Sequence, residues 1–112
     1  MELETSIDGQ TLVVYLYGDL DLNIADRLRD ALDKKIEETA ALNLVVDLSN
    51  VNFIDSSGLG VLLGRYKRVS KAGGKVYLSG AKPHVRSIIE LSGLLRIMEE
   101  FSSTGEALGK IG

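Results

Sequence analysis

The middle of the chain, residues 53–67, reads FIDSSGLGVLLGRYK. The residues before Asp55 are typical of an extended stretch, whereas the apolar residues that follow, including Leu59, Leu62 and Tyr66, recur at helical spacing. The segment therefore predicts a strand-like stretch that passes through a short polar connection into an amphipathic helix. Asp-Ser-Ser-Gly is a common capping sequence, so both serines are expected at or near the helix N-terminus.

The N-terminal part of the chain predicts a hairpin followed by a helix. Residues 3–7 and 11–17 alternate apolar and polar side chains, and Asp8-Gly9 between them favours a tight antiparallel turn. From Ile24 the apolar residues change to helical spacing, which predicts a first helix that ends near Ala40.

The rest of the chain continues the alternation of strands and helices. The apolar run over 42–48 predicts a central strand covered on both faces, and 49–54 read as a turn with a short extended stretch. Further predicted features are a helix stop at Gly73-Gly74, a strand over 75–79, a third helix opened by Pro83 and capped at Gly93, an edge strand over 94–98, and a capping box over 103–106 before a last short helix.

The predicted element order is ββαβαβαβα, which places the chain in the α/β class. Strands that alternate with helices imply right-handed crossovers and a largely parallel sheet, which the N-terminal hairpin makes mixed. We expect four to five strands and about four α-helices. The length of 112 residues fits a single domain over 1–112.

Composition excludes several classes of protein. A hydrophobic fraction of 45% with 26% charged residues is typical of a globular domain. The sequence has no cysteine and one histidine, which excludes disulfides, thiolate zinc sites and Cys/His nucleophilic catalysis. Because the N-terminus is acidic and no apolar run reaches the length of a membrane span, we expect a cytoplasmic protein without a membrane partner.

Charge is distributed unevenly along the chain. Residues 1–55 carry 12 acidic and 4 basic side chains, whereas 56–112 carry 4 acidic and 9 basic ones. The basic residues from Arg65 to Arg86 follow one another without an acid and are expected on the outer face of the second helix and in loops. Aromatic residues make up only 5% of the chain, so we expect no direct nucleic-acid binding and favour an acidic protein patch as the anionic partner.

The serine loop allows two interpretations. Free backbone N–H groups and the positive end of the helix dipole would stabilise a phosphate on Ser56 or Ser57. Gly58 and Gly60 would let another protein approach closely. The alternative is that Asp-Ser-Ser-Gly only caps the helix.

Enzyme motifs are not satisfied in this loop. Neither serine has glycine two residues before it, as a nucleophile elbow requires, and Gly74-Lys75 is followed by valine rather than the Ser/Thr of a P-loop. The glycines from Gly58 to Gly64 miss the dinucleotide-binding spacing. We therefore expect no catalytic residues.

A second polar segment, Gly18-Asp19-Leu20-Asp21, ends the long predicted strand. Asp21 or Asn23 is expected to cap the first helix. Asp55 could lie near these residues only if the fold brings the two segments together. Such a small number of oxygen ligands does not make a convincing metal site. We expect these side chains to form one polar surface with the serine loop, and no metal.

Residues 53–67 resemble the STAS domain of anti-sigma factor antagonists, and the resemblance extends to Gly18-Asp19-Leu20-Asp21, Gly73-Gly74 and Leu91-Ser92-Gly93-Leu94. It covers nearly the whole chain and is greatest to members that control sporulation in endospore-forming bacteria. The STAS fold, a mixed sheet flanked by helices, agrees with the element order predicted above.

The resemblance implies a partner switch controlled by phosphorylation. The unmodified antagonist would bind an anti-sigma factor that is also a serine kinase, and so release the sigma factor. Ser56 would be the phosphoacceptor, and a type 2C protein phosphatase would restore the binding form. The expected partner-binding residues are Asp21, Asn23, Asp55, Ser56, Ser57, Gly58 and Leu59.

On the same resemblance, ATP and magnesium belong to the kinase, so this chain needs no cofactor, and we expect a monomer. Three alternatives stay open. The chain could act on a general stress-response sigma factor, bind a nucleotide itself, or serve as a scaffold without regulated phosphorylation.

Overall fold

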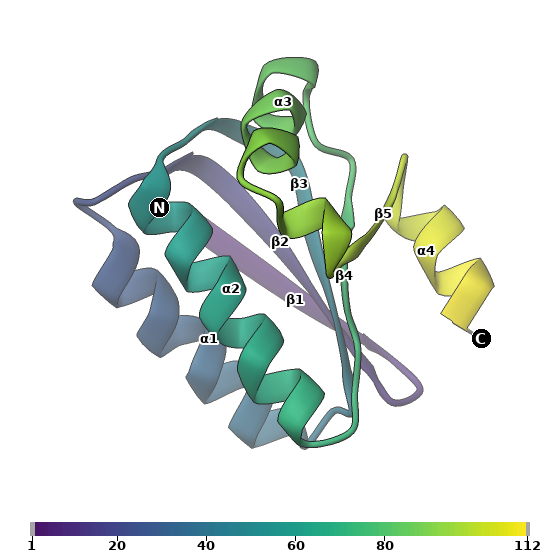
Figure 1. The fold of residues 1–112 in the computed structure, drawn as a ribbon. Helices are drawn as coiled ribbons and strands as arrows, with labels where there is room; N and C mark the ends of the chain where they lie inside the picture. The colour runs from purple at the N-terminus through teal and green to yellow at the C-terminus, as the bar shows by residue number, and fades with distance from the viewer. Residues whose placement is uncertain (1, 112) are drawn as a thin grey trace.

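The strands of the sheet lie side by side in the order in which the chain makes them. The computed structural model describes residues 2–111 and contains β1 (Glu2–Asp8), β2 (Thr11–Leu20), β3 (Asn43–Ile54), β4 (Val76–Ser79) and β5 (Glu99–Phe101). β1 is antiparallel to β2, and every later neighbour is parallel (Figure 1). The predicted mixed, largely parallel sheet is confirmed.

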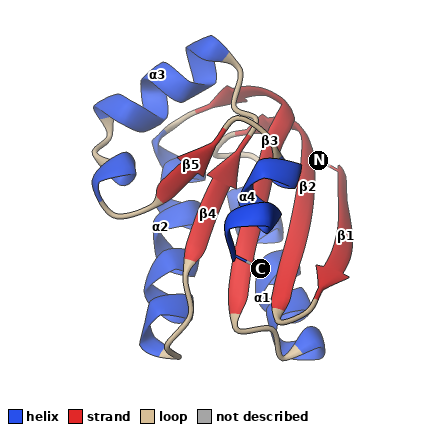
Figure 2. Ribbon diagram, turned by 90° about the vertical axis from the view of Figure 1, so that its right-hand side faces the viewer, coloured by secondary structure: helices blue, strands red, loops and turns tan. Residues whose placement is uncertain are grey.

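The helices cover the two faces of the sheet unequally. They are α1 (Ala25–Thr39), α2 (Ser56–Lys71), α3 (Pro83–Leu91) and α4 (Thr104–Ile111), and their order along the chain confirms ββαβαβαβα. α1 and α2 lie behind the sheet in Figure 2, whereas α4 lies in front of it. The main core holds Leu12, Val14 and Leu16 of β2 with residues of α1, α2 and α3, and a smaller core joins β2 to α4 through Val13 and Ala107.

The central strand is longer than the sequence predicts. The turn predicted within 49–54 is absent, because β3 continues to Ile54 and pairs there with Leu20 of β2, whereas the extended stretch predicted in the same segment is confirmed. The pairing absorbs irregularities near Tyr17 and Gly18, and Gly18 adopts a φ of +94° that favours glycine. This extension carries the ends of both strands to the same place, where the two polar loops begin.

The predicted last edge strand is present but lies at Glu99–Phe101 rather than over 94–98. Gly93 ends α3 in a left-handed conformation, and the chain then forms a 3₁₀ helix over Leu94–Arg96. The Met98 N–H donates to the Leu94 carbonyl at 2.9 Å, so this backbone bonds locally before β5 starts at Glu99. The predicted cap of the last helix is present, because the Glu106 N–H donates to Ser103 Oγ at 3.1 Å.

One edge of the sheet is an acidic strand. β1 pairs only with β2, and its residues Glu2, Glu4 and Asp8 are exposed. Charged side chains on an edge strand are a common feature of sheets whose edge does not pair further.

Candidate functional site

Two polar loops meet where β2 and β3 end. The first loop links β2 to α1, and the second links β3 to α2, so both helices start at the same end of the sheet (Figure 1). The Asp55 N–H donates to the Leu20 carbonyl at 3.2 Å, which ties the second loop to the end of β2. The sequence prediction that Asp55 joins the first loop through the fold is confirmed.

Asp55 serves both loops with one carboxylate. Its Oδ1 accepts hydrogen bonds from the backbone N–H groups of Ser57, at 2.8 Å, and Gly58, at 3.2 Å, and so caps α2. Its Oδ2 accepts a bond from the Leu22 N–H at 3.1 Å. The predicted capping by Asp-Ser-Ser-Gly is confirmed, and the same side chain fixes the backbone of the neighbouring loop.

The two serines at the start of α2 differ in how far they are exposed to solvent. Ser56 is the first helical residue and is exposed, whereas Ser57 is half-buried. The N–H groups of Ser57 and Gly58 are already bonded to Asp55, so these two donors are not free for a phosphate. A phosphate on Ser56 would instead lie beside the carboxylate that holds both loops.

Gly58 brings the two loops into contact. It is buried, and a Cβ placed on it would lie 2.3 Å from the Leu20 carbonyl oxygen and 2.9 Å from Ile54 Cγ1. The expected close approach at Gly58 is therefore made by this chain's own backbone. Gly60 is exposed, and a Cβ there would meet nothing within 4 Å.

Asp21 and Asn23 do not cap α1 as predicted. The N-cap is Ile24, and its side chain is buried and makes no capping bond. Asp21 Oδ1 instead accepts from the Asn23 N–H at 3.0 Å, and the Asp21 carbonyl accepts from the Ile24 N–H at 3.2 Å. The Asp21 carboxylate therefore closes the turn that precedes α1. The Asn23 side chain is exposed and plays no part in the turn's side-chain hydrogen bond.

The structure gathers the predicted partner-binding residues around these two loops. Asn23 and Ser56 are exposed, Gly58 is buried, and the half-buried members are Asp21, Asp55, Ser57 and Leu59. Sequence reasoning gave no role to Leu22, which is 75% exposed beside Asp55. An apolar side chain within a polar turn was the sequence signal that could have marked Leu22 as a surface contact. Residues 2–111 include no group of three or more His, Asp or Glu side chains placed to hold a metal ion.

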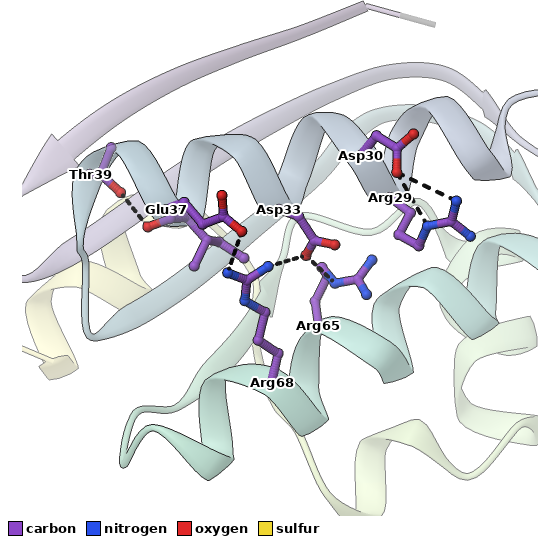
Figure 3. A network of polar contacts seen from close by, with 8 residues as sticks. Arg29, Asp30, Asp33, Glu37, Thr39, Arg65 and Arg68 are labelled. Carbon is purple, nitrogen blue, oxygen red and sulfur yellow. Dashed lines mark hydrogen bonds and ion pairs between the residues drawn. The ribbon is translucent and has the colours of Figure 1, made fainter.

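The basic run is only partly an outer surface. Arg65 is buried and lies against α1, with Nε 3.1 Å from Asp33 Oδ1, and Arg68 Nη1 lies 2.9 Å from the same oxygen (Figure 3). Arg68 also pairs with Glu37, and this hydrogen bond raises the pKa of Arg68, whereas burial lowers the pKa of Arg65. The prediction of an outer surface is therefore wrong for Arg65, which is buried against Asp33 of α1, whereas Lys67, Lys71, Lys75 and Arg86 are exposed as predicted.

Removal of the shared cap should destabilise the fold. Asp55→Ala loses the acceptor for three backbone N–H groups, and we expect the free energy of unfolding to fall by about 2 kcal/mol. Urea unfolding followed by circular dichroism measures this change. Asp55→Asn is the matched control, because its amide oxygen can still cap α2, and it should lose less. Equal stability of Asp55→Ala and the wild type would contradict the assigned role.

A family model of the STAS domain matches residues 2–107. The chain belongs to the STAS domain family. This STAS domain is 34% identical over 111 residues to the anti-sigma F factor antagonist of Paenibacillus polymyxa, with 99% of this chain and 95% of the relative covered. It is 28% identical over 103 residues to the anti-sigma-B factor antagonist of Listeria monocytogenes, with 91% and 89% covered.

The solved structures agree with this family assignment. The anti-sigma factor antagonist SpoIIAA in its unphosphorylated form superimposes on this STAS domain with a TM-score of 0.83 and 26% identity, covering 98% of this chain and 96% of that one. The resemblance found in the sequence is confirmed. No helix in the described part of the chain is both long and apolar enough to cross a membrane.

Proposed function

We propose that this STAS domain is an anti-sigma factor antagonist, which binds an anti-sigma factor and thereby releases a sigma factor. The observation that carries the proposal is Ser56, an exposed hydroxyl at the start of α2 on a surface that two loops build together. The names of the relatives in Paenibacillus polymyxa and Listeria monocytogenes support the same function.

The position of the Ser56 side chain supports the proposal that phosphorylation of this residue controls binding. A kinase must reach the hydroxyl, and Ser56 is exposed where Ser57 is half-buried. The anti-sigma factor is itself the serine kinase in this proposal, and it supplies ATP and magnesium. A type 2C protein phosphatase removes the phosphate, and the switch operates in the cytoplasm without a catalytic residue of this chain.

We assign the sigma factor to sporulation. The relative with 34% identity is an anti-sigma F factor antagonist, and the SpoIIAA structure aligns along nearly the whole chain. The alternative is a general stress-response switch. The similarity to an anti-sigma-B factor antagonist keeps that alternative as the second candidate.

Release of a sigma factor from its inhibitor tests the proposed function directly. A preformed complex of the anti-sigma factor with its sigma factor is mixed with this domain and separated by size-exclusion chromatography. We expect the sigma factor to elute free and this domain to elute with the anti-sigma factor. An unchanged complex at excess domain, with both candidate sigma systems, would contradict the proposal and favour a scaffold or nucleotide-binding role.

A further inference from the structure

A groove of about 290 Å³ lies between α1 and α2, directly beside the serine loop. Leu22, Ala25 and Arg29 line it from the first loop and α1, and Ser57, Gly60 and Arg65 line it from α2. The groove therefore adjoins Ser56 in sequence and shares Ser57 with the proposed partner surface.

The outer part of the groove carries an exposed apolar side chain. Leu22 is 75% exposed, although its backbone N–H is held by Asp55. Gly60 leaves open space, since a Cβ there would meet no atom within 4 Å. An exposed leucine on a fixed backbone loses little conformational entropy when a partner covers it, which favours an apolar contact at this position.

The inner wall of the groove carries a guanidinium with unused hydrogen-bonding capacity. The Arg65 side chain is 10% exposed, and among residues 2–111 its buried Nη1 has no hydrogen-bond partner. Its counter-ion Asp33 is shared with Arg68, so one carboxylate faces two guanidinium groups (Figure 3). Burial lowers the pKa of Arg65, Asp33 partly opposes this shift, and Arg68 and Arg29 add to it, but arginine stays protonated at neutral pH.

A second guanidinium stands at the rim of the groove. Arg29 is paired with Asp26 at 3.2 Å and Asp30 at 3.4 Å, and these two carboxylates are 88% and 75% exposed. Exposed ion pairs of this kind contribute little free energy, so an incoming anion can replace them. The charged residues that line the groove are Asp26, Arg29 and Arg65, and Asp30 and Asp33 pair with the two arginines next to it.

We propose that this groove receives a carboxylate side chain of the anti-sigma factor, with Arg29 and Arg65 as its cationic contacts and Leu22 as the apolar contact next to it. The inference rests on the proposed function and names the chemistry of the partner at the same site. Partner binding excludes water from the groove, which strengthens the attraction between a carboxylate and these guanidinium groups.

The test compares two charge reversals on the same helix. Arg29→Glu removes the rim contact, whereas Arg27→Glu makes the same change of charge at an exposed position outside the groove. Binding to the purified anti-sigma factor is measured by isothermal titration calorimetry, and circular dichroism checks that both variants are folded. We expect Arg29→Glu to bind at least about tenfold more weakly than Arg27→Glu, because long-range electrostatics change equally in both.

Leu22→Ser supplies the second measurement, and a loss of about tenfold in affinity is expected from the uncovered apolar contact. Equal affinities of Arg29→Glu and Arg27→Glu, while the wild type binds, would overturn the groove inference and leave the proposed function standing. A wild-type domain that fails to bind the anti-sigma factor would overturn both.

Discussion

Ser56→Ala should bind the anti-sigma factor as tightly as the wild type and never be released by its kinase activity, whereas Ser56→Asp should bind poorly. The wild type, once phosphorylated, should bind about a hundredfold more weakly than before, which corresponds to about 3 kcal/mol. This is the largest effect expected from any single change in the chain. The two variants separate the loss of the hydroxyl from the gain of negative charge.

The physical reason lies in the way Asp55 is used. A phosphate adds about −1.5 to −2 charges at neutral pH. Beside Ser56, Asp55 already occupies the N–H groups of Ser57 and Gly58 and also holds Leu22. The new charge therefore lies next to a carboxylate that already uses these two donors, and a partner surface that fits a hydroxyl must desolvate the phosphate without compensation.

Intact mass spectrometry after incubation with the anti-sigma kinase and Mg-ATP measures the modification. One phosphoryl group on the wild type and none on Ser56→Ala would establish the residue. Addition to both proteins would move the site, with Ser57 as the next candidate at the same helix start. Addition to neither, or equal affinities of Ser56→Ala and Ser56→Asp, would contradict the switch.

Gly58→Ala should destabilise the fold by about 2 kcal/mol, because a methyl group does not fit between α2 and the end of β2. The added Cβ would lie 2.3 Å from the Leu20 carbonyl oxygen, a backbone atom that moves only if the two loops separate. The loss exceeds the helix propensity that alanine gains over glycine.

Gly60→Ala is the matched control for this substitution. It lies two residues further along the same helix, where the new methyl group meets nothing within 4 Å. We expect it to stabilise the protein by up to about 1 kcal/mol, since alanine is the better helix former. Urea midpoints that shift in the same direction for both variants would show that the contact at Gly58 is not the constraint we describe.

Local signals in the sequence were sufficient for most of the fold. Hydrophobic spacing located the helices, and the capping sequence at Asp55 marked the start of α2 within one residue. The end of β3 was missed, because Ser49, Asn50 and Asn52 have the composition of a turn. They are strand residues only through pairing with β2 over an irregular register, which is a tertiary property.

The sequence identified which residues form the candidate site better than it identified the contacts that they make. The segments around Asp21 and Ser56 were recognised from motifs, and the fold does bring them together. The pairing of Arg65 with Asp33 was missed, because it depends on which face of α2 packs against α1. Leu22 was missed because an exposed apolar residue suggests a binding surface only when its neighbours in space are known.

The acidic edge strand β1 also bears on stoichiometry. If two copies joined antiparallel through β1 with Thr5 at the centre, Glu2 of each would face Asp8 of the other, and like charges directly opposite one another destabilise a strand pair. Antiparallel pairing of two copies through β1 in this register is thus disfavoured. Under the proposed function, a molecule that is not paired through β1 stays available to titrate one anti-sigma factor, so the amount of sigma factor set free would follow the amount of unmodified domain in simple proportion.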